Sequence, residues 1–209
     1  MSRYKILIVG AFPQKGKVIY GGTAKSCQVL LKSSIASRFE IITLDSTQLS
    51  NPPPGIVIRG LLAIRRLFLI TFRTVKHKPN ASLIFASDGW SSIEKGLMIL
   101  VCKLLGSKTL IFPRAEYLID LVSNSYIRLK LIKLLFGSSD IFLCQGEKWK
   151  EFAVSKLNMN QSRIKILNNW TATETKIRIG KNRDFSAGNT VPKVIFVGWL
   201  EGYKGVLEL

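Results

Sequence analysis

Six short apolar segments, most of them followed by a helical pattern, constrain the fold more than any other feature of the sequence. They are Lys5–Gly10, Phe39–Leu44, Ser82–Ala86, Lys108–Phe112, Asp140–Cys144 and Arg163–Leu167. Short continuous apolar runs are typical of strands buried on both faces, and strands that alternate with helices form parallel sheets. The sequence therefore predicts an α/β fold, in which a Rossmann-like parallel sheet has helices on both faces.

The segments between the strands predict the helices that cover the sheet. They are Thr23–Ser37, Ile58–Lys76, Ser91–Gly106, Ser125–Gly137 and Glu147–Asn158. In Ile58–Lys76 apolar residues alternate with arginines and lysines at near-helical spacing, which predicts an amphipathic helix with a basic outer face. The apolar stretches Leu61–Phe72 and Leu97–Leu105 are interrupted by charges and shorter than the roughly 18 residues of a membrane span, so neither is expected to cross a bilayer.

A long loop with two glycines joins the first strand to the first helix. After Lys5–Gly10 the chain passes through Pro13 and Gly16 to the pair Gly21-Gly22, and Thr23 opens the helix. Unpaired N–H groups at a helix N-terminus attract anions, and glycines let a ligand approach the backbone closely. The loop is thus a candidate phosphate-binding corner or an ordinary strand-to-helix turn. Its glycine spacing differs from the G-x-G-x-x-G of dinucleotide sites.

The charge of the chain points to an anionic partner. Lys and Arg number 31 against 13 Asp and Glu, which gives a net charge of +18 over 209 residues. The basic helices Ile58–Lys76 and Tyr126–Phe136, with their apolar residues, suit an anionic membrane surface. The same charge suits nucleic acid or a merely solvated surface. Nucleic acid is the less favoured partner, because the charge is spread along the chain without a recognition helix or an RNP-like aromatic pattern.

The start of the chain and its cysteines indicate a cytoplasmic protein. The first apolar run is too short for the core of a signal peptide. Cys27, Cys102 and Cys144 are odd in number and far apart, and each lies in an apolar or helical segment. They are expected to be small core residues in a reducing compartment, without a disulfide framework or the spacing of a metal site.

Several polar residues follow the predicted strands, at the edge where open α/β sheets bind their ligands. Arg114 and Glu116 follow Lys108–Phe112 and are candidate catalytic residues. They either hold a hydroxyl or phosphate of an acceptor or pair with each other. Asp88 either contacts a sugar hydroxyl or closes its strand in an Asx turn. The single histidine, His77, has no acidic or histidine cluster near it in the sequence, so no metal site is expected.

The sequence pattern changes twice toward the end of the chain. Residues 1–168 hold the repeated strand-and-helix pattern, whereas residues 169–191 are polar with little periodicity and are interpreted as a linker. A new buried strand begins at Lys193–Gly198. A strand and half a turn cannot bury their own apolar faces, so residues 192–209 are expected to start a second, truncated domain.

Four segments together resemble the retaining glycosyltransferases of family 4, which have the GT-B fold of two facing Rossmann-like halves. The first turn with Gly21-Gly22 is similar to the glycine-rich turn of the family. Phe112–Glu116 resembles the P-R-G-E stretch of one branch, and Lys165–Trp170 is similar to V-I-P-N-G. Val194–Gly205 resembles F-V-G-R-L-x-x-x-K-G, which opens the donor-binding half and is the most specific of the four.

The resemblance implies transfer of a sugar from a nucleotide-diphosphate donor to a glycan or lipid-linked acceptor in cell-surface polysaccharide or lipopolysaccharide synthesis. It covers nearly all of this chain but about half of a family member. No metal or other cofactor is implied. The implied roles are donor phosphate binding by Gly21, Gly22 and Lys204, catalysis by Arg114 and Glu116, and acceptor binding by Asp88 and Asn169.

Two features of the closing segment bear on activity. Lys204 keeps the lysine of the family element, whereas Trp199 occupies its arginine position. Residues 1–209 would lack most of the donor pocket, so little or no transfer is expected from them alone. The alternatives are a truncated remnant without catalysis and a basic α/β protein that binds nucleic acid.

Overall fold

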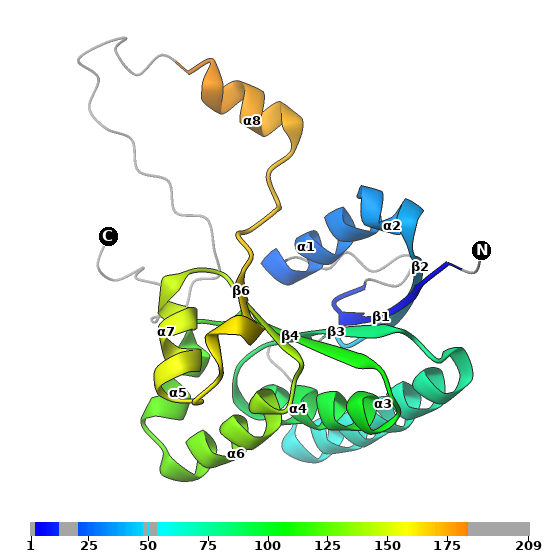
Figure 1. The fold of residues 1–209 in the computed structure, drawn as a ribbon, viewed down its shortest axis with the longest axis vertical. Helices are drawn as coiled ribbons and strands as arrows, with labels where there is room; N and C mark the ends of the chain where they lie inside the picture. The colour runs from blue at the N-terminus through cyan, green and yellow to red at the C-terminus, as the bar shows by residue number, and fades with distance from the viewer. Residues whose placement is uncertain (1–2, 13–20, 48–49, 51–53, 184–209) are drawn as a thin grey trace. The chain divides into compact units, whose positions relative to one another are not determined.

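Six parallel strands form one sheet in the order β2-β1-β3-β4-β5-β6 (Figure 1). The computed structural model describes residues 3–12, 21–47, 50 and 54–183. In chain order the strands are β1 (Lys5–Gly10), β2 (Glu40–Asp45), β3 (Ala81–Ala86), β4 (Lys108–Pro113), β5 (Ile141–Cys144) and β6 (Ile164–Ile166). The predicted Rossmann-like α/β fold is confirmed.

Helices cover both faces of this sheet. One face is covered by α1 (Gly22–Leu31) and the short α2 (Ser34–Arg38). The other is covered by α3 (Ile56–His77), α4 (Gly89–Leu104), α5 (Tyr117–Ser123), α6 (Tyr126–Gly137) and α7 (Glu147–Ser155). Figure 1 shows α1 and α2 above the strands, and α3, α4 and α6 below them. A single 3₁₀ turn, Gln161–Arg163, leads into β6.

Alternating residues of the central strands divide the core between the two faces. Leu7 and Val9 of β1 pack in the larger core under α3 to α7, whereas Ile8 between them packs toward α1. Phe85 and Phe112 join Ile8 on the α1 face. This period of two follows from the pleat of a strand. The apolar runs of β1, β3 and β4 are therefore buried on both faces, as central strands of a covered parallel sheet must be.

All three cysteines are buried and free, in agreement with the sequence prediction. Cys27 belongs to the core of the α1 face, and Cys102 and Cys144 belong to the larger core. Burial raises the pKa of the Cys27 thiol to about 11. The thiol is thus protonated at neutral pH and acts as a small apolar side chain.

The predicted first helix, Thr23–Ser37, is wrong as one element. The chain forms α1 and α2, and Ser33 separates them by accepting a hydrogen bond from the backbone N–H of Ile35 at 3.3 Å. A serine at this position competes with the helix backbone and starts a new helix. The short α5 was not predicted. Its buried Leu118, Ile119 and Val122 attach it to the core directly after β4.

The predicted basic outer face of α3 is incomplete. The helix spans 22 residues, close to the predicted range, but only Ile70 and Thr74 are buried. Leu61 and Phe68, which the apolar pattern assigns to the core side, are exposed. A narrow stripe attaches the helix, in which half-buried Leu67 and Leu69 join Ile70 against the core, and further apolar residues of α3 face outward.

The chain divides into two units, residues 1–171 and 172–209, and each is described by itself. The second unit contains α8 (Glu174–Lys181), which begins where Thr173 accepts a hydrogen bond from the N–H of Lys176. This helix lies within the segment expected to be an irregular linker. Of the helices in the described ranges, none is both long and apolar enough to span a membrane.

Candidate functional site

The carboxyl ends of the parallel strands meet at one edge of the sheet, and the polar residues predicted from the sequence follow them. Asp45 closes β2 and fixes the chain that leaves β1. Its Oδ1 accepts hydrogen bonds from the N–H of Phe12 at 3.1 Å and of Thr47 at 3.0 Å. The N–H of Ser46 in turn donates to the carbonyl of Gly10 at 2.8 Å. The loop after β1 is thereby anchored at its start.

Helix α1 begins with the glycine pair at this edge. Gly21 has φ of 143°, a backbone conformation that favours glycine, and its carbonyl accepts the first helical bond, from Lys25. Among the described residues, a Cβ atom added at Gly22 would meet nothing within 4 Å. The first turn of α1 contains no acidic side chain. A helix start of this kind attracts anions, because its first N–H groups have no partner within the helix.

A chain of two hydrogen bonds connects Arg114 to the first turn of α1. Nη2 of Arg114 donates to the Ser26 hydroxyl at 2.9 Å, and this hydroxyl donates to the carbonyl of Gly22 at 2.9 Å. Ser26 is fully buried, so its position is fixed by the packing of α1. The structure therefore brings two predicted site residues, Arg114 and Gly22, to a shared partner.

Two aromatic rings hold the guanidinium of Arg114. Its Cζ lies 5.0 Å from the ring centroid of Phe112 and 5.5 Å from that of Trp170, and the two rings stack at 5.5 Å. The indole N–H of Trp170 donates to the carbonyl of Ser26 at 3.0 Å. These contacts attach the chain after β6 to α1 and restrict the orientation of the guanidinium, which aromatic faces attract.

One terminal nitrogen of Arg114 has hydrogen-bonding capacity left over. Nη1 is buried and has no hydrogen-bond partner within the described part of the chain. Burial lowers the pKa of the guanidinium, while Cys27 acts in the opposite direction. An arginine nevertheless stays charged at neutral pH. A buried cation with an unused donor suits a ligand with an anionic oxygen, since unsatisfied buried donors are costly.

Glu116 does not pair with Arg114, although both follow β4. Its carboxylate accepts a hydrogen bond from Nζ of Lys148, on α7, at 2.5 Å. Both side chains are about two-thirds exposed. The pairing with Glu116 raises the pKa of Lys148. The two candidate catalytic residues thus have separate surroundings: one is half-buried against α1, and the other is exposed beside α7.

The two predicted acceptor residues are also at the carboxyl edge. Asn169 accepts a hydrogen bond from the side-chain amide of Gln145 at 3.2 Å, which links the chain after β6 to the end of β5. Asp88 is the residue before α4, and its side chain makes no capping hydrogen bond there. The Asx turn that the sequence offered as an alternative for Asp88 is therefore not supported. Lys204 and Trp199 lie outside the described residues.

Sequence reasoning missed three contributors to the site: Ser26, Lys148 and Gln145. Ser26 is 88 positions from Arg114, and nothing in its local sequence distinguishes it from other helix serines. Lys148 and Gln145 flank the start of α7, and their position just after β5 was the available signal. Within the described ranges, no three His, Cys, Asp or Glu side chains are grouped closely enough to hold a metal ion.

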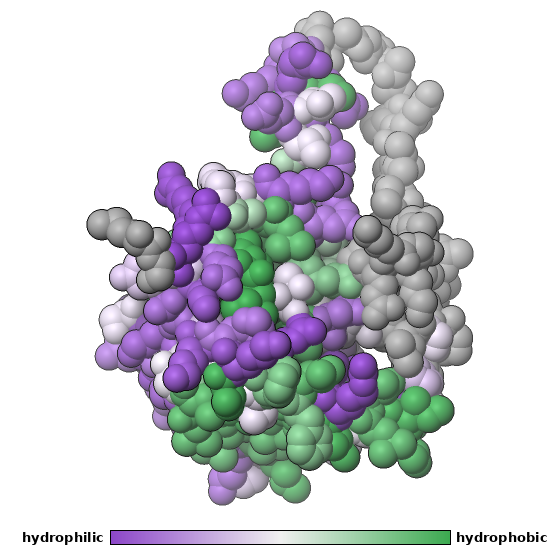
Figure 2. All heavy atoms as spheres, turned by 90° about the vertical axis from the view of Figure 1, so that its right-hand side faces the viewer, coloured by the Kyte–Doolittle hydropathy of each residue, from purple (hydrophilic) through white to green (hydrophobic). Residues whose placement is uncertain are grey.

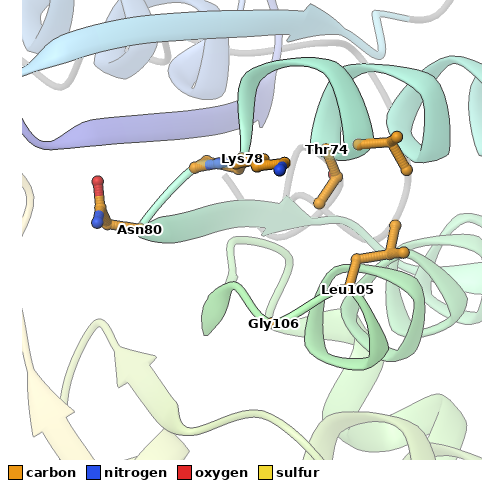
Figure 3. Close-up of a pocket in the computed structure, with 7 residues that line it drawn as sticks. Thr74, Lys78, Asn80, Leu105 and Gly106 are labelled. Atoms are coloured by element: carbon orange, nitrogen blue, oxygen red, sulfur yellow. The ribbon is translucent and has the colours of Figure 1, made fainter.

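A hollow of about 430 Å³ lies at the opposite, amino edge of the sheet (Figure 3). Its lining comes from the ends of α3 and α4, where Thr74, Lys78 and Leu105 gather, with Asn80 at the start of β3. The backbone N–H and carbonyl of Asn80 and its Oδ1 all take part in hydrogen bonds with neighbouring strands. These Asn80 groups thus serve the sheet, and none of the site residues predicted from the sequence lines the hollow, so the carboxyl edge is the candidate functional site.

A scan against models of known protein families and a search of curated protein sequences find no match to this chain.

Proposed function

We propose that this chain forms the acceptor-side half of a retaining glycosyltransferase of family 4 with the GT-B fold. The proposed reaction transfers a sugar from a nucleotide-diphosphate donor to a glycan or lipid-linked acceptor, without a metal ion. The proposed location is the cytoplasm, including the inner face of the cytoplasmic membrane, in polysaccharide or lipopolysaccharide synthesis. A Rossmann-like sheet hosts many activities, so the support has to come from the site.

The single observation that supports this function best is the placement of Arg114. Its guanidinium lies against the stacked rings of Phe112 and Trp170, donates a hydrogen bond to Ser26 of α1, and has one buried nitrogen without a hydrogen-bond partner among the described residues. A fixed cation beside the open N-terminus of a helix suits a phosphate group. Either the donor diphosphate or a phosphate on a lipid-linked acceptor has this chemistry.

The reaction chemistry requires such a cation more than it requires a strong nucleophile. As the bond between sugar and diphosphate breaks, negative charge grows on the leaving phosphate. Groups that are already oriented stabilise this charge without reorganising, and interactions that strengthen in the transition state raise the rate. We assign this role to Arg114 together with the N–H groups of Gly22 and its neighbours, and to Lys204 on the strength of the resemblance.

Glu116, Asp88 and Asn169 are proposed to contact hydroxyl groups of the acceptor. Glu116 is exposed and, within the described residues, pairs with one lysine through Oε1, which leaves its second oxygen for a ligand. Asn169 keeps its amide nitrogen free to donate when its oxygen accepts from Gln145. Carboxylates and amides at strand ends are the usual means of orienting a polar ligand.

Calorimetric titration of the 209-residue chain with a nucleoside diphosphate and with inorganic pyrophosphate tests this proposal. Arg114→Met keeps the stacked aliphatic chain but removes the charge, and the loss of one charged hydrogen bond is expected to weaken binding about tenfold or more. Arg38→Met is the matched control. It removes the same charge from an exposed position at the opposite edge of the sheet and should leave the affinity unchanged.

A second substitution covers the case in which Arg114→Met also disturbs packing. Gly22→Trp places a large ring at the start of α1, where an added Cβ meets no described atom within 4 Å, so the thermal midpoint should stay near that of the unsubstituted chain. Diphosphate binding should nevertheless fall. Equal affinities for all four proteins, or a loss that follows net charge alone, would contradict a phosphate site at this edge.

A further inference from the structure

The outward side of α3 carries an apolar stripe along the whole helix. Its members recur every three or four residues, and each is more than half exposed: Val57, Leu61, Ile64, Phe68, Phe72 and Val75. Residues at this spacing lie on one face of a helix. Isolated exposed hydrophobic residues are common, but a continuous stripe of six indicates a surface that is covered in use.

The stripe extends over the neighbouring helices. Helix α4 contacts both α3 and α6, so the three form one layer on the same side of the sheet (Figure 1). On α4, Leu104 is 85% exposed, and on α6, Ile127 and Leu134 are 78% and 66% exposed. Figure 2 shows hydrophobic side chains gathered over the lower part of the molecule, with hydrophilic ones beside them. We call this the α3–α4–α6 surface.

The charge of this surface has a single sign. Its basic residues are Arg59, Arg65, Arg73 and Lys76 on α3, Lys103 on α4, and Arg128, Lys130 and Lys133 on α6, whereas Lys95 is buried. The only acidic residue of the three helices is Glu94, which is buried and bonded to Arg66. Nζ of Lys76 and of Lys130 lie over the rings of Phe72 and Tyr126, at 5.6 and 4.5 Å.

These charges discriminate between the possible occupants of the surface. A second copy of the chain would bring like charges together, with no exposed acid in the three helices to neutralise them. Nucleic acid would satisfy the cations but leave the apolar stripe in water. An anionic lipid bilayer satisfies both, because its headgroups attract lysine and arginine while the acyl boundary takes up the apolar side chains.

We propose that the α3–α4–α6 surface docks on an anionic membrane, with α3 lying along the interface and its apolar stripe inserted between the headgroups. Arg114 projects from the opposite, α1 side of the sheet, beside Ser26. Docking through α3 therefore leaves the proposed phosphate site uncovered by lipid. The inference rests on the exposed surface itself and does not depend on which sugar reaction the other site performs.

Co-sedimentation of the 209-residue chain with lipid vesicles tests the proposal. The chain should bind vesicles with about one-third phosphatidylglycerol, and bind much more weakly to pure phosphatidylcholine. Phe68→Ser with Phe72→Ser should reduce binding at least tenfold by removing apolar insertion. Arg65→Gln with Lys76→Gln should reduce it by about fivefold for each charge.

Matched controls remove similar groups from elsewhere in the same unit. Tyr4→Ser with Ile35→Ser takes away two exposed hydrophobic residues, and Lys32→Gln with Arg38→Gln takes away two exposed charges. Both pairs should bind vesicles like the unsubstituted chain. Diphosphate binding should stay unchanged in the α3 variants, so failure of docking and failure of the phosphate site are separately visible.

Three results would overturn the proposal. The first is vesicle binding that the α3 serine pair leaves intact. The second is a reversible dimer in sedimentation velocity that the same pair abolishes, which would assign the surface to a second copy. The third is binding of a random single-stranded polynucleotide more tightly than anionic vesicles, with dependence on the basic pair and none on the serine pair.

Discussion

At the scale of single residues, a buried ion pair shows how this chain retains charge inside its core. Glu94 is 7% exposed and accepts hydrogen bonds from Nε and Nη2 of Arg66 at 2.6 and 2.9 Å. Nζ of Lys95, almost fully buried, lies 3.4 Å from the same carboxylate. Burial alone would raise the pKa of Glu94, but the bonds from Arg66 and the charge of Lys95 lower it overall.

The Glu94→Gln substitution should lower the free energy of unfolding at neutral pH by about 3 kcal/mol, because it leaves the buried Lys95 without a counter-charge. Since the folded pKa of Glu94 is below its ordinary 4.5, its carboxylate stabilises the fold above that pH, and this contribution is lost as pH falls through the folded pKa. The variant should therefore lose less stability in acid than the unsubstituted chain. Urea unfolding followed by circular dichroism at several pH values measures both effects.

Glu40→Gln is the control for the ion pair. Oε1 of Glu40 lies 3.9 Å from Nζ of Lys5, and both side chains are well exposed. Removal of such a surface pair is expected to change stability by less than ~0.5 kcal/mol, with no distinct effect in acid. If the two glutamine variants behaved alike, the cluster around Glu94 would not have the stabilising role assigned to it.

At the scale of elements, one glycine determines how closely α4 and α6 approach. A Cβ atom added at Gly96 would lie 2.5 Å from Cβ of Leu135, closer than packed side chains allow. Gly60, in the interior of α3, has nothing within 4 Å of the same position. The two glycines are both helical, yet only the first is required by packing.

Substitution of glycine by alanine should therefore change the stability of the fold in opposite directions at the two positions. Gly60→Ala should stabilise the chain by about 0.5–1 kcal/mol through helix propensity. Gly96→Ala should destabilise it by about 1–3 kcal/mol, because α6 has to shift away from α4. The midpoints of unfolding in guanidinium chloride measure the change in stability of both variants. Stabilisation by both substitutions would contradict the close contact between the helices.

The strands could be predicted from sequence to within a residue or two, because short apolar runs have few alternatives in a chain of this length. The break between α1 and α2 could not, since one serine cap decides it. The sequence led us to expect apolar residues beside the basic ones on the membrane-facing side of α3, but not the extent of the exposed stripe: periodicity shows that one face of a helix is apolar, but not that the buried part of that face is narrower. At the site, Arg114 and Gly22 were predicted, whereas their link through Ser26 requires the tertiary fold.

At the scale of the whole molecule, the chain has a net charge of +18, and basic residues lie on two different surfaces. One is the carboxyl edge of the sheet, where a single arginine is fixed by Phe112, Trp170 and Ser26. The other is the α3–α4–α6 surface, where many exposed cations flank apolar side chains. The sheet separates them. A phosphate ligand should therefore bind Arg114 in preference to the exposed arginines of the α3–α4–α6 surface.

The most direct test of the proposed phosphate site is an NMR titration of the arginine side-chain nitrogens with a nucleoside diphosphate. The Arg114 resonance is assigned by its loss in Arg114→Met. It should shift in a saturable way at concentrations that leave the signals of Arg59, Arg65 and Arg73 on α3 in place. An Arg114 signal that stays unchanged at saturation, or a uniform shift of all arginines, would contradict a phosphate site at the carboxyl edge.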